Sequence, residues 1–446
     1  MPTACHVALE APFDPALAPI RARVVAGERL SFDDGLALYR TRDIFTLGEL
    51  ANLVRERLHG RRAYYNINRH INYTNYCVLR CKFCSFYRPY GGQPEGTRAR
   101  RHAGTEGSIG VPPLPQARGA KSKIQNPKSK MAPPADQSAI RNPQSAIAVP
   151  RAAGYEFTLD EIVAQAAEAA AQGATEVHIV GGLHPKLPFS YYTDMCRAIK
   201  QRCPTLHIKA FTAIEIVHFT RITQPRRSIA EVLTALRDAG LDSLPGGGAE
   251  IFDDRVHGEA FKNKVGEQHW FDVHRVAHEL GIPSNATMLY GHVETVPERV
   301  RHLLKLREHQ DVSLRERRAG FQCFVPLSFI TDGSELAHLP GPTGLDDLRT
   351  LAVARLMLDN FAHLKAFWIM QSPKLAQVAL DWGVDDFDGT VVWYDITRRE
   401  GRGTNRQELT VDQIRRLIRE AGCEPVERDT LYRKVRRDAP ATHARN

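Results

Sequence analysis

The sequence contains no long apolar run. Its longest runs, such as Cys323–Leu327, span only several residues, whereas a helix that crosses a bilayer needs roughly 20 apolar residues. The N-terminus, with early acidic residues at Glu10 and Asp14, lacks the positively charged and then apolar order of a secretory signal. We therefore expect no membrane span, no membrane partner and a cytoplasmic location. The 446 residues, 43% of them apolar, suffice for one large domain or two ordinary ones.

Cysteine is also scarce, with eight residues in the whole chain. Five of them are scattered, whereas Cys77, Cys81 and Cys84 fall within eight positions. In a chain expected in the cytoplasm, such a cluster more often binds a metal than forms disulfides.

Residues 93–153 lack aromatic side chains altogether. They hold nine of the 27 prolines and ten Lys or Arg residues against three acidic ones. Such a segment cannot bury enough apolar surface to offset the entropy lost on ordering, so we predict a disordered basic insertion. Because it offers no aromatic side chain on which bases could stack, we expect no nucleic-acid partner. An RNA-binding or partner-binding arm stays open as an alternative.

Elsewhere, short apolar runs alternate with helical patterns, which is typical of βαβ units and a parallel sheet. Thr158 with Glu161, and Ser228 with Glu231, form capping boxes that predict helix starts. The predicted strands are Tyr65–Ile71, Glu176–Gly182, His207–Ala213, Asp242–Gly246, Ser284–Tyr290, Gln322–Phe329, Ala366–Met370 and, weakly, Thr390–Trp393.

This run of units predicts an α/β fold, a TIM-like (β/α) barrel of six to eight units with its active site at the C-terminal ends of the strands. A doubly wound open sheet is the alternative. Residues 1–60 are predicted to be a helical N-terminal region, with Ser31 and Thr46 as caps. The barrel and its C-terminal extension occupy 61–433, interrupted by 93–153, and 438–446 is a predicted disordered tail.

The motif Cys77-Val-Leu-Arg-Cys81-Lys-Phe-Cys84 places three thiolates on one loop directly after the first predicted strand. A structural zinc site normally has four protein ligands, and this segment supplies three cysteines and no nearby His. A [4Fe–4S] cluster held by three thiolates leaves one iron free for an outside ligand, which is a catalytic arrangement. The spacing therefore favours a reactive cluster. A zinc site completed by a distant residue is the alternative.

This CxxxCxxC motif, with Phe83 before its last cysteine, resembles the radical S-adenosylmethionine (SAM) superfamily. The resemblance implies that Cys77, Cys81 and Cys84 hold the cluster, that the open iron binds the amino acid end of SAM, and that Phe83 belongs to the cofactor site.

The same resemblance implies that Gly181 and Gly182, at the end of the second barrel strand, receive the SAM amino group. Glycine fits this place because it lets a backbone carbonyl approach a ligand. The chain has Leu183 where many superfamily members carry Glu, so the carbonyls are the expected contact.

Longer stretches resemble the branch of the superfamily that serves the menaquinone and deazaflavin pathways. They are Val180–Pro185, Leu244–Glu250, Asn285–Glu294, Leu358–Asn360 and Pro425–Thr430, and with the cysteine loop they cover most of 61–433 outside the insertion. Within the branch, Thr287–His292, Leu364–Trp368 and Glu427–Thr430 are most similar to the aminofutalosine synthases.

That resemblance implies a transferase reaction in menaquinone biosynthesis. The reduced cluster cleaves SAM, and the 5′-deoxyadenosyl radical adds to 3-[(1-carboxyvinyl)oxy]benzoate. Rearrangement and loss of a carboxylate then give 6-amino-6-deoxyfutalosine and methionine. The implied cofactors are the [4Fe–4S] cluster and SAM, which is consumed, and the implied partners are the aromatic dicarboxylate and an electron donor such as flavodoxin or ferredoxin.

Such a substrate needs cations or hydrogen-bond donors near the barrel mouth. His184, Lys209, His292 and Lys365 fit this description by their place near predicted strand ends. His292 and Glu294 are the predicted catalytic residues, because Tyr-Gly-His-Val-Glu places polar side chains beside a glycine and imidazole titrates near neutral pH.

The glycine-rich Leu244–Glu250 stretch lacks the patterns that bind nucleoside triphosphates. Glu250 is instead a predicted acceptor for the ribose hydroxyls of SAM. Residues 393–400 depart from the family pattern, which leaves substrate contacts there open.

Two alternatives remain. One is a dehypoxanthine futalosine cyclase, in which the radical abstracts hydrogen instead of adding. The other is a metal-cluster protein that binds nucleic acid through the 93–153 insertion, and it would show salt-sensitive RNA binding. The sequence does not indicate an oligomeric state.

Overall fold

The computed structural model describes residues 14–91, 154–261, 264–391 and 408–437. The predicted insertion, the predicted tail and the atypical residues 393–400 therefore lie outside the described residues. On either side of the insertion, the described residues of 14–90 and 154–437 belong to one compact unit.

The chain begins with a short 3-10 helix, Pro15–Leu17, and three α-helices, α1 (Ala18–Ala26), α2 (Phe32–Arg40) and α3 (Ile44–His59). The predicted cap at Ser31 is confirmed, since its side chain accepts a hydrogen bond from the Asp34 N–H. The predicted cap at Thr46 is wrong. Helix α3 starts three residues earlier than a cap at Thr46 predicts, so Asp43 is its cap and accepts a hydrogen bond from the Thr46 N–H.

The described residues that follow contain nine strands, and all the pairings among these strands are parallel. The strands are β1 (Arg62–Asn66), β2 (Asn68–Ile71), β3 (Glu176–Ile179), β4 (His207–Ala210), β5 (Ser284–Tyr290), β6 (Phe321–Ser328), β7 (His363–Leu364), β8 (Asp386–Gly389) and β9 (Glu424–Glu427).

The pairings close into a ring. β2 pairs with β3 and β3 with β4, single bridges at Ser243 and Leu244 join β4 to β5, and β5 continues to β6 and β7. A bridge between Lys365 and Asp386 leads to β8, which pairs with β1, the segment that runs into β2. The predicted α/β barrel is thus confirmed, and β9 adds a further strand beside β1.

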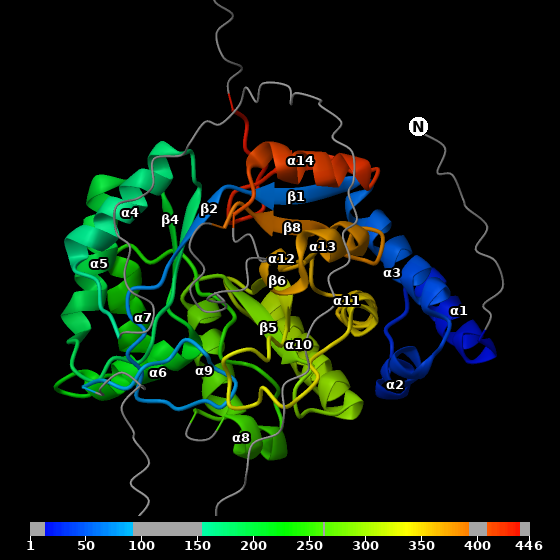
Figure 1. Cartoon of the computed structure of the whole chain (residues 1–446), viewed down its shortest axis with the longest axis horizontal. Coiled ribbons are helices and arrows are strands. Elements are labelled where there is room, and N and C mark those ends of the chain that lie inside the picture. Colours follow the sequence, from blue (N-terminus) through cyan, green and yellow to red (C-terminus); the bar gives the residue numbers. More distant parts are fainter. Residues whose placement is uncertain (1–13, 92–153, 262–263, 392–407, 438–446) are drawn as a thin grey trace, which may run out of the picture. The chain divides into compact units, whose positions relative to one another are not determined.

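Helices form the outer layer (Figure 1). Helix α4 packs beside β2, α10 beside β5, and α11 beside β6. The helices are α4 (Leu159–Ala171), α5 (Phe189–Arg202), α6 (Ala213–Ile222), α7 (Ile229–Asp238), α8 (Asp254–Ala260), α9 (Glu267–Glu279), α10 (Val296–Glu316), α11 (Gly344–Met357), α12 (Trp368–Gln371), α13 (Pro373–Ala379) and α14 (Val411–Glu420). Capping boxes begin α4 and α7, as predicted. None of the helices described here is long and apolar enough to span a membrane.

Four strand predictions need correction. For the weak prediction Thr390–Trp393, strand β8 ends at Gly389, and Thr390 and Val391, its two described residues, belong to no strand. The predicted strand Tyr65–Ile71 is divided between β1 and β2, which belong to different sheets. Asp242–Gly246 contributes only the bridges at Ser243 and Leu244. Ala366–Met370 is wrong, because β7 ends at Leu364 and α12 occupies Trp368–Gln371. A short apolar run does not distinguish a strand from one buried helical turn.

Alternate residues of the strands face opposite sides. Val177 and Ile208 are fully buried in the apolar core, and Arg69 donates hydrogen bonds to Glu168 and Gln172 on the α4 side. The other side, toward the barrel axis, is polar. There the six charged groups of Glu176, Lys209, Lys365, Asp386, Asp388 and Arg428, all buried, form what we call the interior network.

Candidate active site

The cysteine loop leaves the C-terminal end of β2. The Cys77 N–H donates to the Arg88 carbonyl at 3.1 Å, and the Cys84 N–H donates to the Cys81 carbonyl at 3.1 Å, so the loop folds back on itself. Burial raises the pKa of all three thiols, to about 12 at Cys81. Repulsion from Cys84 adds to the rise at Cys77 and Cys81, and repulsion from Cys77 adds to it at Cys81. The three sulfurs therefore lie within electrostatic reach of one another, as ligands of one cluster must.

The glycine pair that follows β3 closes over this loop. The Gly182 N–H donates to the Thr74 carbonyl at 2.9 Å. An ideal Cβ on Gly182 would lie 2.2 Å from the Tyr76 carbonyl oxygen and 3.0 Å from Cys77 Cβ. Among the described residues, no group donates a hydrogen bond to the carbonyl oxygen of Gly181 or Gly182. The pair thus permits close approach and keeps two acceptors available for a ligand.

Glu215 is a site residue that the sequence analysis missed. Its carboxylate accepts hydrogen bonds from the Tyr73 hydroxyl at 2.7 Å and from the Gly181 N–H at 3.2 Å, while it also caps α6 with Thr212. Burial raises its pKa to about 7. The sequence signal was a Thr-x-x-Glu capping box, but only the fold places this carboxylate against the glycine pair.

Lys264 is a second missed residue. Its ammonium forms an ion pair with Glu250 and lies 5.2 Å from the ring centroid of Phe83. Burial opposes the charge of Lys264, but attraction from Glu250 and from the Cys81 and Cys84 sulfurs raises its pKa. Two of the predicted cofactor residues, Phe83 and Glu250, thus meet at one buried cation beside the cysteine loop.

A small hollow borders this ion pair. Its lining includes Glu250, Phe261, Lys264 and Trp270. The Glu250 backbone has a φ of 42°, unusual for a residue with a side chain and a form of strain that collects at binding sites.

His292 and Glu294 lie in the turn that follows β5. Glu294 accepts hydrogen bonds from the Gly291 and His292 N–H groups at 2.6 and 2.9 Å and pairs with Arg299 at 2.8 Å. The imidazole of His292 is edge-on to Phe261 at 5.4 Å between centroids, and burial lowers its pKa. Glu294 therefore holds the turn, while the neutral imidazole of His292 faces the same region as Lys264.

The other candidate cations have different surroundings. His184 lies 2.7 Å from a Glu156 carboxylate oxygen. Lys209 lies 3.1 Å from Glu176, which also accepts a hydrogen bond from Thr430. Lys365 pairs with Asp388 inside the barrel and has no second acidic hydrogen-bond partner among the residues described.

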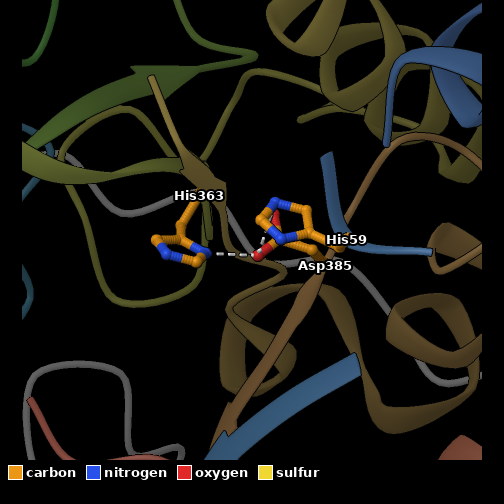
Figure 2. A group of neighbouring side chains, drawn as sticks. All are labelled: His59, His363 and Asp385. Carbon is orange, nitrogen blue, oxygen red and sulfur yellow. Dashed lines mark hydrogen bonds and ion pairs between the residues drawn. The ribbon is translucent and has the colours of Figure 1, made fainter. Parts of the chain in front are cut away.

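Figure 2 shows one further group with the spacing of a metal site, His59, His363 and Asp385, whose ligand atoms all lie within 4.8 Å of one another. His363 Nδ1 and Asp385 Oδ2 are 2.7 Å apart, and Arg355 binds the other carboxylate oxygen at 2.5 Å. A buried guanidinium disfavours a second cation at the same carboxylate. The group instead ties the end of α3 to β7 and to the residue before β8.

Two family models match this chain. The Radical SAM superfamily model matches residues 71–306, and the CofH/MqnC C-terminal region matches residues 318–441. The first match spans the cysteine loop, the glycine pair and Glu250.

Two characterised relatives align over nearly the whole length. The Aminodeoxyfutalosine synthase of Thermus thermophilus is 44% identical over 427 residues, covering 95% of this chain and 97% of the relative. The Cyclic dehypoxanthine futalosine synthase of Streptomyces coelicolor is 31% identical, covering 95% and 90%.

Among solved structures, methylornithine synthase (PylB) has a similar fold. The TM-score is 0.60 with 14% identity, covering 91% of this chain and 97% of that one. At this identity the likeness concerns the fold alone.

Proposed function

Because this chain belongs to the radical SAM superfamily and, within it, to the aminodeoxyfutalosine synthases, we propose that it converts 3-[(1-carboxyvinyl)oxy]benzoate and SAM into 6-amino-6-deoxyfutalosine and methionine. The observation that carries the proposal is 44% identity along 95% of the chain, together with a three-thiol loop closed by a glycine pair. The cyclase relative, at 31% identity, makes hydrogen abstraction the second candidate.

The residues of the cysteine loop fit a [4Fe–4S] cluster. Cys77, Cys81 and Cys84 supply three thiolates from one loop, and metal binding would release their protons because the thiolate is the ligand. When bound, the cluster supplies the electron that cleaves SAM. The protein's part is to hold the loop, which it does through the hydrogen bond from the Val78 N–H to the Leu183 carbonyl, 3.0 Å long.

The glycine pair is the proposed site for the amino group of SAM. The Gly181 and Gly182 carbonyls are acceptors, and their N–H groups are already used by Glu215 and Thr74, which fixes their direction. Phe83 and the Glu250–Lys264 pair border the same space. Glu250 is the proposed acceptor for the ribose hydroxyls, and Lys264 neutralises it before the ligand binds.

His292 is proposed to orient the substrate or move a proton, since burial keeps its imidazole neutral and a neutral ring can either donate or accept. A Glu294 carboxylate oxygen lies 3.1 Å from His292 Nδ1, and Glu294 also fixes the turn. Both assignments remain proposals.

An electron donor such as flavodoxin or ferredoxin is the proposed protein partner. The proposed compartment is the cytoplasm, where thiols stay reduced. In support, the seven described cysteines are all free of disulfides.

The decisive experiment is anaerobic reconstitution followed by a product assay. Iron- and sulfide-loaded protein is incubated with SAM, reductant and the carboxyvinyl ether, and products are identified by mass. We expect an adenine-containing adduct. Free 5′-deoxyadenosine without adduct would support the cyclase-type reaction, and a colourless zinc protein would refute the proposal.

A further inference from the structure

One ion pair of the interior network uses only part of its hydrogen-bonding capacity. Lys365 Nζ lies 2.6 Å from Asp388 Oδ1, and Asp388 is 1% exposed. Within the part of the chain that is described, Asp388 Oδ2 has no hydrogen-bond partner. The Lys365 ammonium donates only one of its three N–H groups there, to Asp388 Oδ1. Buried polar atoms are nearly always paired, so unused ones indicate a missing ligand.

A third unused group lies on the neighbouring strand, β1, which pairs with β8. The side chain of Asn66 is completely buried, and neither its Nδ2 nor its Oδ1 has a partner among the described residues. An ideal Cβ on Gly389 would lie 2.3 Å from Asn66 Oδ1, so Asn66 is packed against the residue next to Asp388. Asp388 itself has a left-handed φ of 71°, a strain typical of functional sites.

These groups stand on the catalytic side of the barrel. Lys365 directly follows β7, Asp388 is the third of the four residues of β8, and Asn66 is the last residue of β1. Lys209, in contrast, donates to both carboxylate oxygens of Glu176, at 3.4 and 3.1 Å, whereas Lys365 donates to only one oxygen of Asp388.

The charge balance indicates which ligand fits. With all six groups ionised, the interior network has three positive and three negative charges. Burial raises the pKa of Asp388, and repulsion from Asp386 adds to this against the attraction of Lys365. If Asp388 takes up one proton, the network gains a net charge of +1 and has an O–H donor at Oδ2, which suits an anion. The other titratable and charged groups facing this pair are His70, Glu176, His178, Lys209, Cys323 and Arg428.

We propose that Lys365, Asp388 and Asn66 form a buried polar site near the C-terminal ends of β7, β8 and β1, here called the floor site, and that it binds one carboxylate of the aromatic substrate. Lys365 and Asn66 Nδ2 donate hydrogen bonds, and Asp388 donates its acid proton. Binding therefore takes up one proton from solvent, so that the charge of the bound carboxylate is balanced. The identity of the ligand rests on the proposed function, whereas the site itself rests on the unused groups.

Lys365→Met tests the site in the reconstituted holoenzyme. We expect the KM for the carboxyvinyl ether to rise about 10- to 100-fold, the range for a lost charged hydrogen bond, with SAM affinity unchanged. Lys200→Met is the control, because Lys200 pairs with Asp242 at 2.7 Å on the outside of the barrel, and its KM should stay at the wild-type value. A rise in the Kd for SAM without a rise in the substrate KM would assign the floor site to SAM and overturn the proposal.

The pH profile separates a positioning role from a structural one. Wild-type KM should rise with pH, about tenfold per unit once Asp388 must be protonated for binding. Asp388→Asn keeps a neutral donor with nearly the same shape, so its KM should be nearly independent of pH. A parallel rise in both proteins contradicts the proposal, and this comparison still applies if Lys365→Met does not fold.

Calorimetry with isophthalate, a plain aromatic dicarboxylate, separates this proposal from the proposed reaction. If wild-type protein makes no adduct but binds isophthalate in a Lys365-dependent way, the proposed reaction fails and the floor site stands. If adduct forms while Lys365→Met and Asp388→Asn leave KM and its pH dependence unchanged, the reaction stands and the floor site is refuted.

Discussion

Gly182→Ala isolates the close approach between the glycine pair and the cysteine loop. The added Cβ would lie 2.2 Å from the Tyr76 carbonyl oxygen and 3.0 Å from Cys77 Cβ. To reach ordinary van der Waals separation, that backbone must move by about 1 Å. Overpacking of this kind costs about 1–3 kcal/mol, which a large barrel tolerates. The ligands of a cluster must be placed within about 0.5 Å of their correct positions. A backbone shift of this size therefore moves Cys77 out of position while the fold is retained.

The assay is iron content per chain after anaerobic reconstitution, with 5′-deoxyadenosine formation and thermal unfolding measured in parallel. We expect iron and activity to fall at least tenfold while the fold is retained. The control is Gly258→Ala in α8, where an ideal Cβ meets nothing within 4 Å, and the substitution should stabilise that helix by about 1 kcal/mol. Full iron loading and normal activity in Gly182→Ala would refute the role of the close approach.

Three further outcomes are expected. Cys81→Ser should abolish the absorbance of the cluster. Cys196→Ser, at a buried position in α5, should leave that absorbance unchanged. The pKa of Glu215 is about 7 in the folded protein and near 4.5 in the unfolded chain. Its contribution to the free energy of unfolding is therefore complete below pH 4.5 and is lost as the pH rises through 7, roughly 3 kcal/mol in all. Urea unfolding from pH 5 to 8 should show that loss in the wild-type protein and not in Glu215→Gln. Asp385→Asn leaves the buried Arg355 without its carboxylate partner and should lower the free energy of unfolding by about 3–5 kcal/mol. The exposed control Asp381→Asn should change that free energy little. Equal losses in the two variants would contradict the structural role assigned to Asp385.

The parts of the fold that sequence predicts best are those with a local signal. Strand β5 matches its prediction at both ends because Ser284–Tyr290 is buried at every position. Helices α4 and α7 begin at their predicted capping boxes. Strand β9 was not predicted, since Glu424–Glu427 is short and has charged residues at both ends, and it becomes a strand only by pairing with β1.

The same distinction applies to the candidate site. The three cysteines and the glycine pair are each contiguous in sequence, so their motifs were visible. Lys264 and Glu215 have no local pattern that indicates a cofactor, because their positions depend on segments far apart in the chain. His292 and Glu294 were chosen for their place at a strand end, but sequence could not indicate that the Glu294 carboxylate is used to hold its own turn.

The polarity of the barrel interior is itself evidence of function. TIM-like barrels are ordinarily filled by branched apolar side chains, whereas here His70 and His178 stack with 4.5 Å between ring centroids amid six charged groups. Buried ion pairs are often no more stabilising than apolar residues of equal volume, so stability alone does not explain them. Lys209 and Glu176 satisfy each other, and Arg428 satisfies Asp386 at 2.6 Å. Lys365 and Asp388 keep unused hydrogen-bonding groups, so they are the part of the interior that can bind a ligand.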